Sequence, residues 1–438
     1  MSDLKQTISF ATNLYLQKAR TLYAGYVRRA PLAQLHLRRG RENPYALYER
    51  IRADGVLVPT RLGNWSTASH RVCGAVLRDR RFGVRPADAA GAEAAVAADG
   101  ADAGGLSFLE MNPPDHTRLR RLAQPAFGPK AVAAYRERIE RTAGGLLERA
   151  AGAGAGGFDL VSAFAAPLPI AVITELLGVP DANADEFAAY GATVGSALDG
   201  IKSLRHAARL RAEEAKLARL FGDLFALRRE EPRDDLVSAL VAAGGDRIRP
   251  AEVLPMCELL LLAGFETTVN LIGNCVLALL DRPEQWEAVC ADPAGLAPRA
   301  VEEALRYDPP VQATSRVALE PVEVEGRPVR KGQWIVTLIG GANRDPEVYE
   351  RPDEFDLHRV DPPEHLAFSA GVHYCLGQPL ARLEAQIAIQ LLAERMPGLA
   401  RAGAVRRRNS STIRGPLHMP VRAGNSSRAA QTGVALQA

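Results

Sequence analysis

A chain of 438 residues in which 47% are apolar can bury a large core. Its net charge of +3 is small for this length, which argues against nucleic-acid binding as the main function. The cysteines form no CxxC pair and no zinc-type spacing, so we expect free thiols in a reducing compartment and a cytoplasmic location; they are Cys73, Cys257, Cys275, Cys290 and Cys375.

The first 33 residues are predicted to form an N-terminal extension. They show neither the features of a secretory signal nor an uninterrupted apolar span of membrane length, so no transmembrane segment is expected. Residues 14–29 could lie on a membrane surface as a basic amphipathic helix. A short helix packed on its own domain is the favoured interpretation.

The chain up to about residue 315 is predicted to be mostly helical, because apolar residues recur there at three- and four-residue spacing. Examples are 132–149, 161–177 and 208–228. The Gly/Ala-rich stretch 86–105 predicts a surface loop. Short strands around Gly and Pro turns are predicted from about residue 316, a last helix over 380–394 and a disordered tail over 424–438.

A helix is predicted to open at the sequence PPDHTRLR, which begins at Pro113. Pro and Asp are favourable at a helix N-terminus. His116 and Arg120, four residues apart, share one face of it. An ordinary basic surface helix explains this pattern equally well.

The run 256–280 is apolar nearly all round, which predicts a helix buried in the centre of the domain. Glu266 and Asn270 make it a poor membrane span, and a polar cluster at Glu266, Thr267 and Thr268 is costly in such a setting. Thr267 is expected to bond back to the carbonyl of Ala263 and loosen the helix. The alternative is that the helix merely bends at Gly264 and that the polar cluster has no function.

Glu303 and Arg306 lie one turn apart and can pair. The same ExxR pattern occurs at 49–52 and 230–233, so it is weak evidence by itself. Only the copy at Glu303 stands between the central helix and the cysteine segment described next.

The sequence FSAGVHYCLG over 368–377 is the strongest local feature. It predicts a loop in which Cys375 faces the N-terminus of the helix that follows. Backbone N–H groups and the helix dipole stabilise a thiolate, the form of cysteine that binds metals. Gly371 and Gly377 allow a tight backbone close to a flat cofactor. Five fixed positions make this a strong motif.

This segment resembles the haem-binding signature of the cytochrome P450 superfamily. Four motifs in the family's order extend the resemblance over about residues 43–422, and the chain is identified as a member of the soluble bacterial, actinobacterial-like type. The resemblance implies a single-domain, mainly α fold with a smaller β region, and haem between the long central helix and the cysteine loop. We therefore expect one domain over 34–423, in place of the two or three that length alone suggests.

The resemblance also implies roles for individual residues. Cys375 is the expected axial thiolate ligand of haem b, and such a ligand favours O–O cleavage. Glu266 and Thr267 are the expected proton-delivering pair, and Glu303 with Arg306 a buried structural pair. The expected cofactor-binding residues are His116, Arg120, Arg316, Phe368, His373 and Gly377.

One position departs from the family pattern. The family often has a basic residue where this chain has Glu354, and that base joins the Glu–Arg pair. Arg351 or His365 is the expected substitute, unless the triad is incomplete.

The predicted function is O₂-dependent hydroxylation or epoxidation of an apolar small molecule, such as a secondary metabolite, by a monomer. The chain has no dinucleotide fingerprint and no iron–sulfur cysteine cluster. Electrons from NAD(P)H are therefore expected to arrive through a separate ferredoxin and ferredoxin reductase. The expected substrate pocket is lined by 86–110, 311–314, Phe265 and 411–413.

Other functions compete with this one. The same fold could couple phenols, use peroxide, or bind haem without turnover. A hydrolase with Cys375 as nucleophile and His373 as base is disfavoured, because a pair two residues apart in a tight loop aligns poorly.

Overall fold

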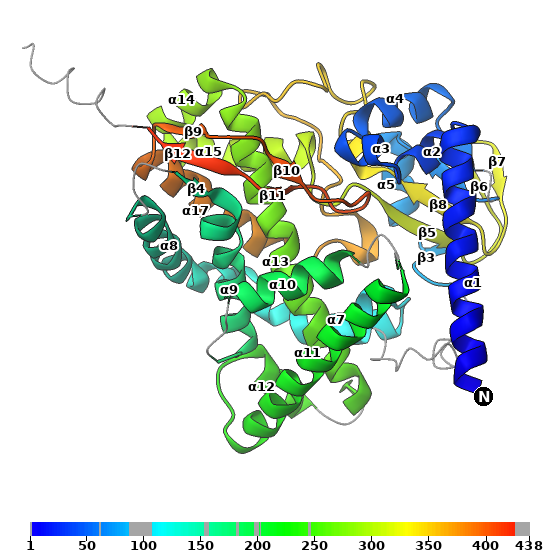
Figure 1. The fold of residues 1–438 in the computed structure, drawn as a ribbon, viewed down its shortest axis with the longest axis horizontal. Coiled ribbons are helices and arrows are strands. Elements are labelled where there is room, and N and C mark those ends of the chain that lie inside the picture. Colours follow the sequence, from blue (N-terminus) through cyan, green and yellow to red (C-terminus); the bar gives the residue numbers. More distant parts are fainter. Residues whose placement is uncertain are drawn as a thin grey trace, which may run out of the picture.

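The computed structural model describes residues 2–60, 63–86, 107–152, 157–180, 184–196, 201, 203–243 and 247–424. Helices dominate it (Figure 1). They are α1 (Ser2–Leu22), α2 (Pro31–Gln34), α3 (Arg38–Glu42), α4 (Tyr45–Ala53), α5 (His70–Arg78), α7 (Asp115–Ala123), α8 (Pro129–Gly152), α9 (Pro167–Leu177), α10 (Ala184–Gly195), α11 (Leu204–Glu230), α12 (Leu236–Ala243), α13 (Pro250–Leu280), α14 (Pro283–Ala291), α15 (Pro293–Tyr307), α16 (Ile339–Ala342) and α17 (Gln378–Arg395).

The strands are short. Five of them form one sheet in the order β1-β2-β8-β5-β3, and β4, β12 and β9 form another, while β10–β11 and β6–β7 are separate antiparallel pairs. Their bounds are β1 (Val58–Pro59), β2 (Trp65–Thr67), β3 (Phe82–Gly83), β4 (Phe158–Asp159), β5 (Thr314–Ala318), β6 (Val322–Val324), β7 (Arg327–Val329), β8 (Trp334–Thr337), β9 (Leu399–Arg401), β10 (Arg406–Arg407), β11 (Pro416–His418) and β12 (Pro420–Ala423).

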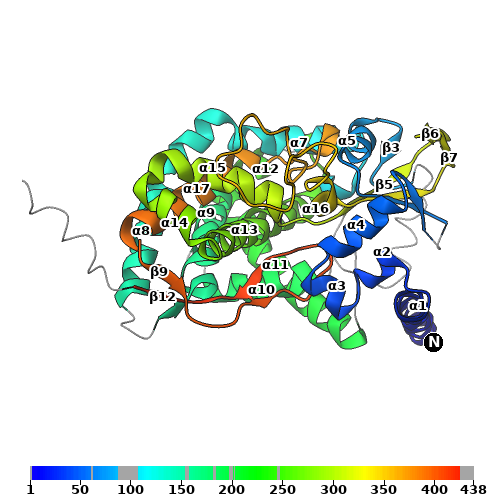
Figure 2. The ribbon, with the colours of Figure 1, turned by 90° about the horizontal axis from the view of Figure 1, so that it is seen from above.

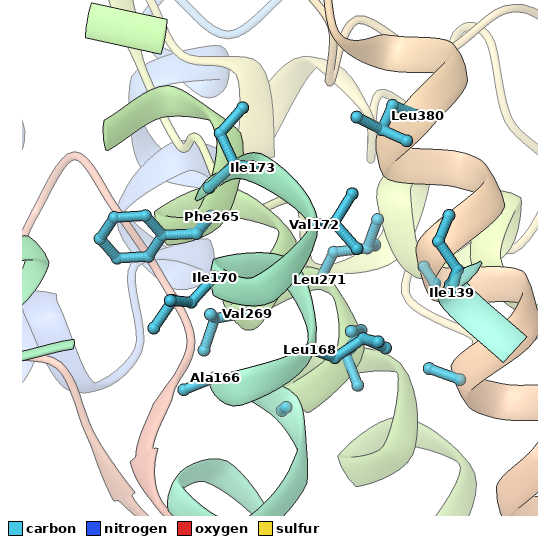
Figure 3. Close-up of a cluster of buried hydrophobic side chains, with 14 of the residues drawn as sticks. Ile139, Ala166, Leu168, Ile170, Val172, Ile173, Phe265, Val269, Leu271 and Leu380 are labelled. Carbon is cyan, nitrogen blue, oxygen red and sulfur yellow. The ribbon is translucent and has the colours of Figure 1, made fainter. Parts of the chain in front are cut away.

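The long helix α13 forms the centre of the fold. Pro250 occupies its first turn, and the Glu252 carboxylate accepts a hydrogen bond from the Arg249 backbone N–H at 2.8 Å, so the N-terminus is well capped. α13 packs against α9, α15 and α17. Figure 3 shows side chains of α8, α9, α13 and α17 meeting in one core, with Leu168, Leu271 and Leu380 among them.

α13 is also, within the described ranges, the one helix long and apolar enough to cross a membrane. Of its apolar stretch, 72% is buried inside the protein. This burial agrees with the predicted core helix.

α1 lies along one edge of the molecule and far from α13 (Figures 1 and 2). It is longer than the short packed helix that the sequence favoured. Tyr15, Leu22 and Tyr26, the last in the π-helical turn after α1, expose 41–66% of their surface. The helix is therefore only partly packed on the rest of the chain.

Most predicted elements are present, and one expectation is wrong. The helices predicted at 132–149, 208–228 and 380–394 are α8, α11 and α17. However, strands do not begin at residue 316: β1 to β4 precede it, and each has only two or three residues. The predicted loop at 86–105 and tail at 424–438 lie almost wholly outside the described residues.

Candidate active site

The loop before α17 places Cys375 at the N-terminus of that helix. The Cys375 backbone N–H donates to the Phe368 carbonyl at 2.9 Å, which closes the loop. Gly371 has φ +70°, and a Cβ at this position would collide with the carbonyl oxygen of Leu77, so only glycine fits. The predicted tight backbone is therefore present.

Opposing effects act on the Cys375 sulfur. Burial has the largest effect and holds the pKa of the thiol above its ordinary value. The backbone N–H of Gly377, the charges of Arg120 and Arg382 and the backbone N–H of Gln378 all lower it. The two backbone N–H groups are the thiolate-stabilising donors predicted at the helix start, and the two arginines add to them.

The sequence analysis missed Arg382, one turn into α17. Its guanidinium lies 4.5 Å from the centroid of the Phe368 ring and donates to the Glu302 carboxylate at 2.6 Å. It thereby joins α15, α17 and the cysteine loop. Its position in the first turns of the helix that follows Cys375 was the available signal, because a cation there would stabilise a thiolate.

The predicted pair on α7 meets the cysteine loop. The rings of His116 and His373 lie 4.2 Å apart between centroids. Arg120 donates to the carbonyl of Tyr374 at 2.6 Å. His116 and Arg120 therefore share the face of α7 that contacts the cysteine loop.

Arg316 reaches the same loop from β5. Its guanidinium donates to the hydroxyl of Ser369 at 3.3 Å and to the carbonyl of Ser315 at 2.9 Å. Its residue exposure is only 5%. A buried guanidinium with these neutral acceptors lacks the anion that normally accompanies it.

The four basic side chains repel one another. Burial, then His116, Arg316 and Arg120, lower the pKa of His373 to about 3, and burial with Arg120 lowers that of His116 to about 4. Burial also lowers the pKa of Arg316 to about 10. Among the described residues no carboxylate pairs with the four.

Three ring nitrogens in this cluster are buried without a partner in the described part of the chain: Nδ1 and Nε2 of His116 and Nε2 of His373. Buried polar atoms normally find a partner. A cluster of buried donors beside a thiolate-stabilising loop suits a group that carries carboxylates and a metal. The residues therefore fit haem with its two propionates.

On α13, Thr267 remains accessible although the residues around it are mostly buried. Its hydroxyl donates to the Ala263 carbonyl at 3.1 Å, the predicted back-bond, and Thr268 makes the same bond to Gly264 at 3.2 Å. Glu266 is 3% exposed and pairs with Arg408 at 2.8 Å. The acid and the alcohol are thus neighbours with separate partners.

The predicted pocket segments are partly brought together. The Gln312 backbone N–H donates to the Thr412 carbonyl at 2.8 Å, and Val311 pairs with Ile413. Phe265, however, is 2% exposed and lies against Gly191 of α10. Residues 87–106 lie outside the described ranges.

The Glu303–Arg306 pair is buried, as predicted, but its third member was assigned wrongly. Arg359 donates to Glu303 at 3.0 Å and completes the triad. Arg351 pairs instead with Glu354 at 2.7 Å, and His365 with Glu302 at 3.2 Å. The basic member of the triad thus lies five residues after Glu354, the position where the family often has it. It reaches Glu303 because the loop after Glu354 folds back over α15.

Comparisons with known proteins agree with this geometry. The cytochrome P450 family profile matches residues 296–395. The chain is 44% identical over 326 residues to cytochrome P450 107B1 of Saccharopolyspora erythraea, covering 73% of this chain and 78% of that protein. It is 38% identical over 368 residues to the cytochrome P450 monooxygenase PikC of Streptomyces venezuelae, covering 82% and 85%.

Solved structures show the same fold. The ligand-free structure of CYP164A2 from Mycobacterium smegmatis superposes with a TM-score of 0.82 at 36% identity, covering 90% of this chain and 99% of that one. The chain therefore belongs to the bacterial cytochrome P450 family and is a monooxygenase.

Proposed function

We propose that Cys375 is the axial ligand of haem b and that the enzyme hydroxylates or epoxidises an apolar small molecule. The observation that carries this proposal is the basic cluster next to the Cys375 loop, in which three buried histidine ring nitrogens have no partner among the described residues. The catalytic domain would span 34–423. When bound, haem supplies O₂ activation, and its thiolate ligand favours O–O cleavage.

The basic cluster would hold the propionates. Hydrogen bonds to a charged partner are each worth about 1.5–3 kcal/mol. The assigned residues are His116, Arg120, Arg316 and His373, with Phe368 and Gly377 shaping the loop around the ligand. Each propionate would supply the negative charge that the cluster lacks.

We expect Arg120→Ala to lower the haem content of the purified protein, because the propionates lose a charge-assisted donor. Haem per polypeptide and the rate of haem transfer to an acceptor protein measure this. Arg121→Ala is the matched control, since Arg121 is the exposed neighbour on α7. Equal haem content and equal resistance to haem loss in the two variants would count against the assignment.

Glu266 and Thr267 would deliver protons. The Thr267 hydroxyl is accessible in the middle of a buried helix, where it can hold a proton donor in place. The Glu266 carboxylate would take protons from solvent and pass them on.

Thr267→Ala is expected to keep haem binding and substrate affinity but to lower the product formed per NAD(P)H consumed. The missing electrons should be recovered as peroxide, because proton placement and not O₂ binding is impaired. Thr268→Val, which removes a buried hydroxyl of the next residue, should stay coupled. One assay that measures NAD(P)H consumption, product and peroxide together tests this prediction. If Thr267→Ala forms as much product per NAD(P)H as the wild type, Thr267 has only a structural role.

The electrons would come from NAD(P)H through a separate ferredoxin and its reductase. The sequence has neither a dinucleotide fingerprint nor an iron–sulfur cysteine cluster. The expected partner is therefore a small iron–sulfur protein, and the enzyme would work as a cytoplasmic monomer.

The substrate class is proposed from the pocket segments and from relatives. The segments 311–314 and 411–413 carry no charged side chain. Similar proteins include a nocardicin C N-oxygenase, 42% identical, and a tirandamycin C-bound monooxygenase, 35% identical. A secondary metabolite is therefore the proposed substrate, and binding spectra against a panel of such compounds would test it.

A further inference from the structure

The carboxylate of Glu266 is held by a residue far away in the sequence. Arg408, in the connection between β10 and β11, places a guanidinium nitrogen 2.8 Å from Glu266 Oε1. The side chains are 14% and 4% exposed, respectively. Such a buried ion pair has a large effect when one partner is removed, because the other charge is left uncompensated.

Arg408 is itself fixed by the next turn of α13. Its Nε donates to Asn270 Oδ1 at 2.9 Å, and Asn270 Nδ2 donates to the backbone carbonyl of Glu266 at 2.7 Å. The guanidinium thus contacts one side chain through Nε and another through a terminal nitrogen. A planar fork suits this double contact, whereas a lysine can offer only one point of charge.

The carboxylate also lies against two glycines of α10. A Cβ built on Gly195 would lie 2.9 Å from Glu266 Oε1, and one on Gly191 would lie 3.4 Å from Oε2. The two glycines are four residues apart and share a helix face. The lack of a side chain at Gly195 leaves the space that the carboxylate occupies, and at Gly191 it leaves space for the Phe265 ring.

The connection that carries Arg408 also reaches the predicted substrate pocket. The Arg408 backbone N–H donates to Gly415, and the Gln312 N–H donates to Thr412 at 2.8 Å. Val311 pairs with Ile413. Residues 408–415 therefore join the acid of α13 to the segment after α15.

We infer that Arg408 is the positioning residue for Glu266, holding its carboxylate ionised against α10 and tying it to the 408–415 connection that borders the substrate pocket. The inference rests on the proposed function only where it concerns turnover. To serve as a proton relay, the carboxylate must leave Arg408 and approach Thr267. A substrate that contacts residues 411–413 would then change how firmly Arg408 holds the Glu266 carboxylate.

Burial and Arg408 act in opposite directions on the pKa of Glu266. Burial has the larger effect and holds this pKa above its ordinary value, and the charge of Arg408 lowers it. Among the described residues, Arg408 is the one charged group that opposes the effect of burial on the pKa of Glu266. A neutral residue at 408 would leave an ionised carboxylate buried without compensation, and such a group takes up a proton.

Infrared difference spectroscopy of the purified haem protein tests this inference without any turnover. At neutral pH, the wild type minus Glu266→Gln spectrum should show an ionised carboxylate. Arg408→Gln should gain the carbonyl band of a protonated acid, and the double variant Arg408→Gln/Glu266→Gln should lose that band. Arg408→Lys should keep the carboxylate ionised.

Arg407→Gln is the matched control, because Arg407 pairs with Asp308 at 3.3 Å and not with Glu266. It should not produce the acid band. A protonated Glu266 in the wild type would overturn the inference even if Arg408→Gln failed to fold. An unchanged Glu266 spectrum in a folded Arg408→Gln variant would overturn it as well.

Turnover measured on the same proteins separates the two claims. If Glu266→Gln turns over at the wild-type rate while the infrared result holds, the proposed relay fails and the positioning of Glu266 stands. If Glu266→Gln slows turnover but Arg408→Gln leaves the carboxylate ionised, the relay stands and the inference fails. Where both hold, the effects of Arg408→Gln and Glu266→Gln on turnover should be less than additive.

Discussion

Cys375→Ser is expected to abolish the strongly red-shifted Soret band of the ferrous–CO complex. That band depends on a thiolate ligand, and a serine hydroxyl at this position cannot supply one. Cys375 alone among the five cysteines lies at the start of α17, where the backbone N–H groups of Gly377 and Gln378 act on its sulfur. The measurement is the absorption spectrum of the reduced protein under CO, normalised to haem content.

The other cysteines provide the controls. Cys73, Cys257 and Cys275 are buried inside helices, away from the loop before α17, and burial raises the pKa of each thiol, to about 12 for Cys73. Cys290→Ser, at a partly exposed position, should keep the wild-type spectrum. A variant Cys375→Ser that retained the red-shifted band, with another cysteine proving essential, would refute the assignment.

Glu303→Ala is expected to destabilise the protein by about 3–5 kcal/mol, because it leaves two arginines buried without their anion. Glu303 accepts from Arg306 at 2.7 and 2.8 Å and from Arg359 at 3.0 Å. The exposed fractions of the three side chains are 6%, 2% and 11%. Denaturant unfolding at matched haem loading measures the loss.

Glu354→Ala is the matched control on the same loop. Glu354 pairs with Arg351, and both side chains are more than half exposed. An exposed pair contributes about 0–1 kcal/mol. Equal losses in the two variants would mean that the Glu303 triad contributes no more than a surface ion pair.

The sequence predicted best where a strong local pattern coincides with a buried element. The all-round apolar run at 256–280 is the core of α13, and the Cys375 motif forms a loop leading into α17. The spacing of four residues between His116 and Arg120 predicted that they lie on one face of a helix. Each of these features depends on neighbouring residues, so a single sequence contains them.

The sequence predicted poorly where partners come from distant segments. Arg359 reaches Glu303 only because the loop after Glu354 folds back, and Arg408 reaches Glu266 across 142 positions of sequence. No periodicity encodes either contact. The strands β1 and β3 were missed for another reason, since two residues are too few to show alternation.

The most direct test of the account is labelled-oxygen incorporation by the reconstituted enzyme. Once binding spectra have identified a substrate, the protein is supplied with ¹⁸O₂, NAD(P)H, a ferredoxin and its reductase. The account predicts one labelled oxygen atom in each product molecule, and loss of labelled product in Cys375→Ser. Product whose new oxygen comes from water, product that contains no new oxygen, or unchanged product formation by Cys375→Ser would contradict it.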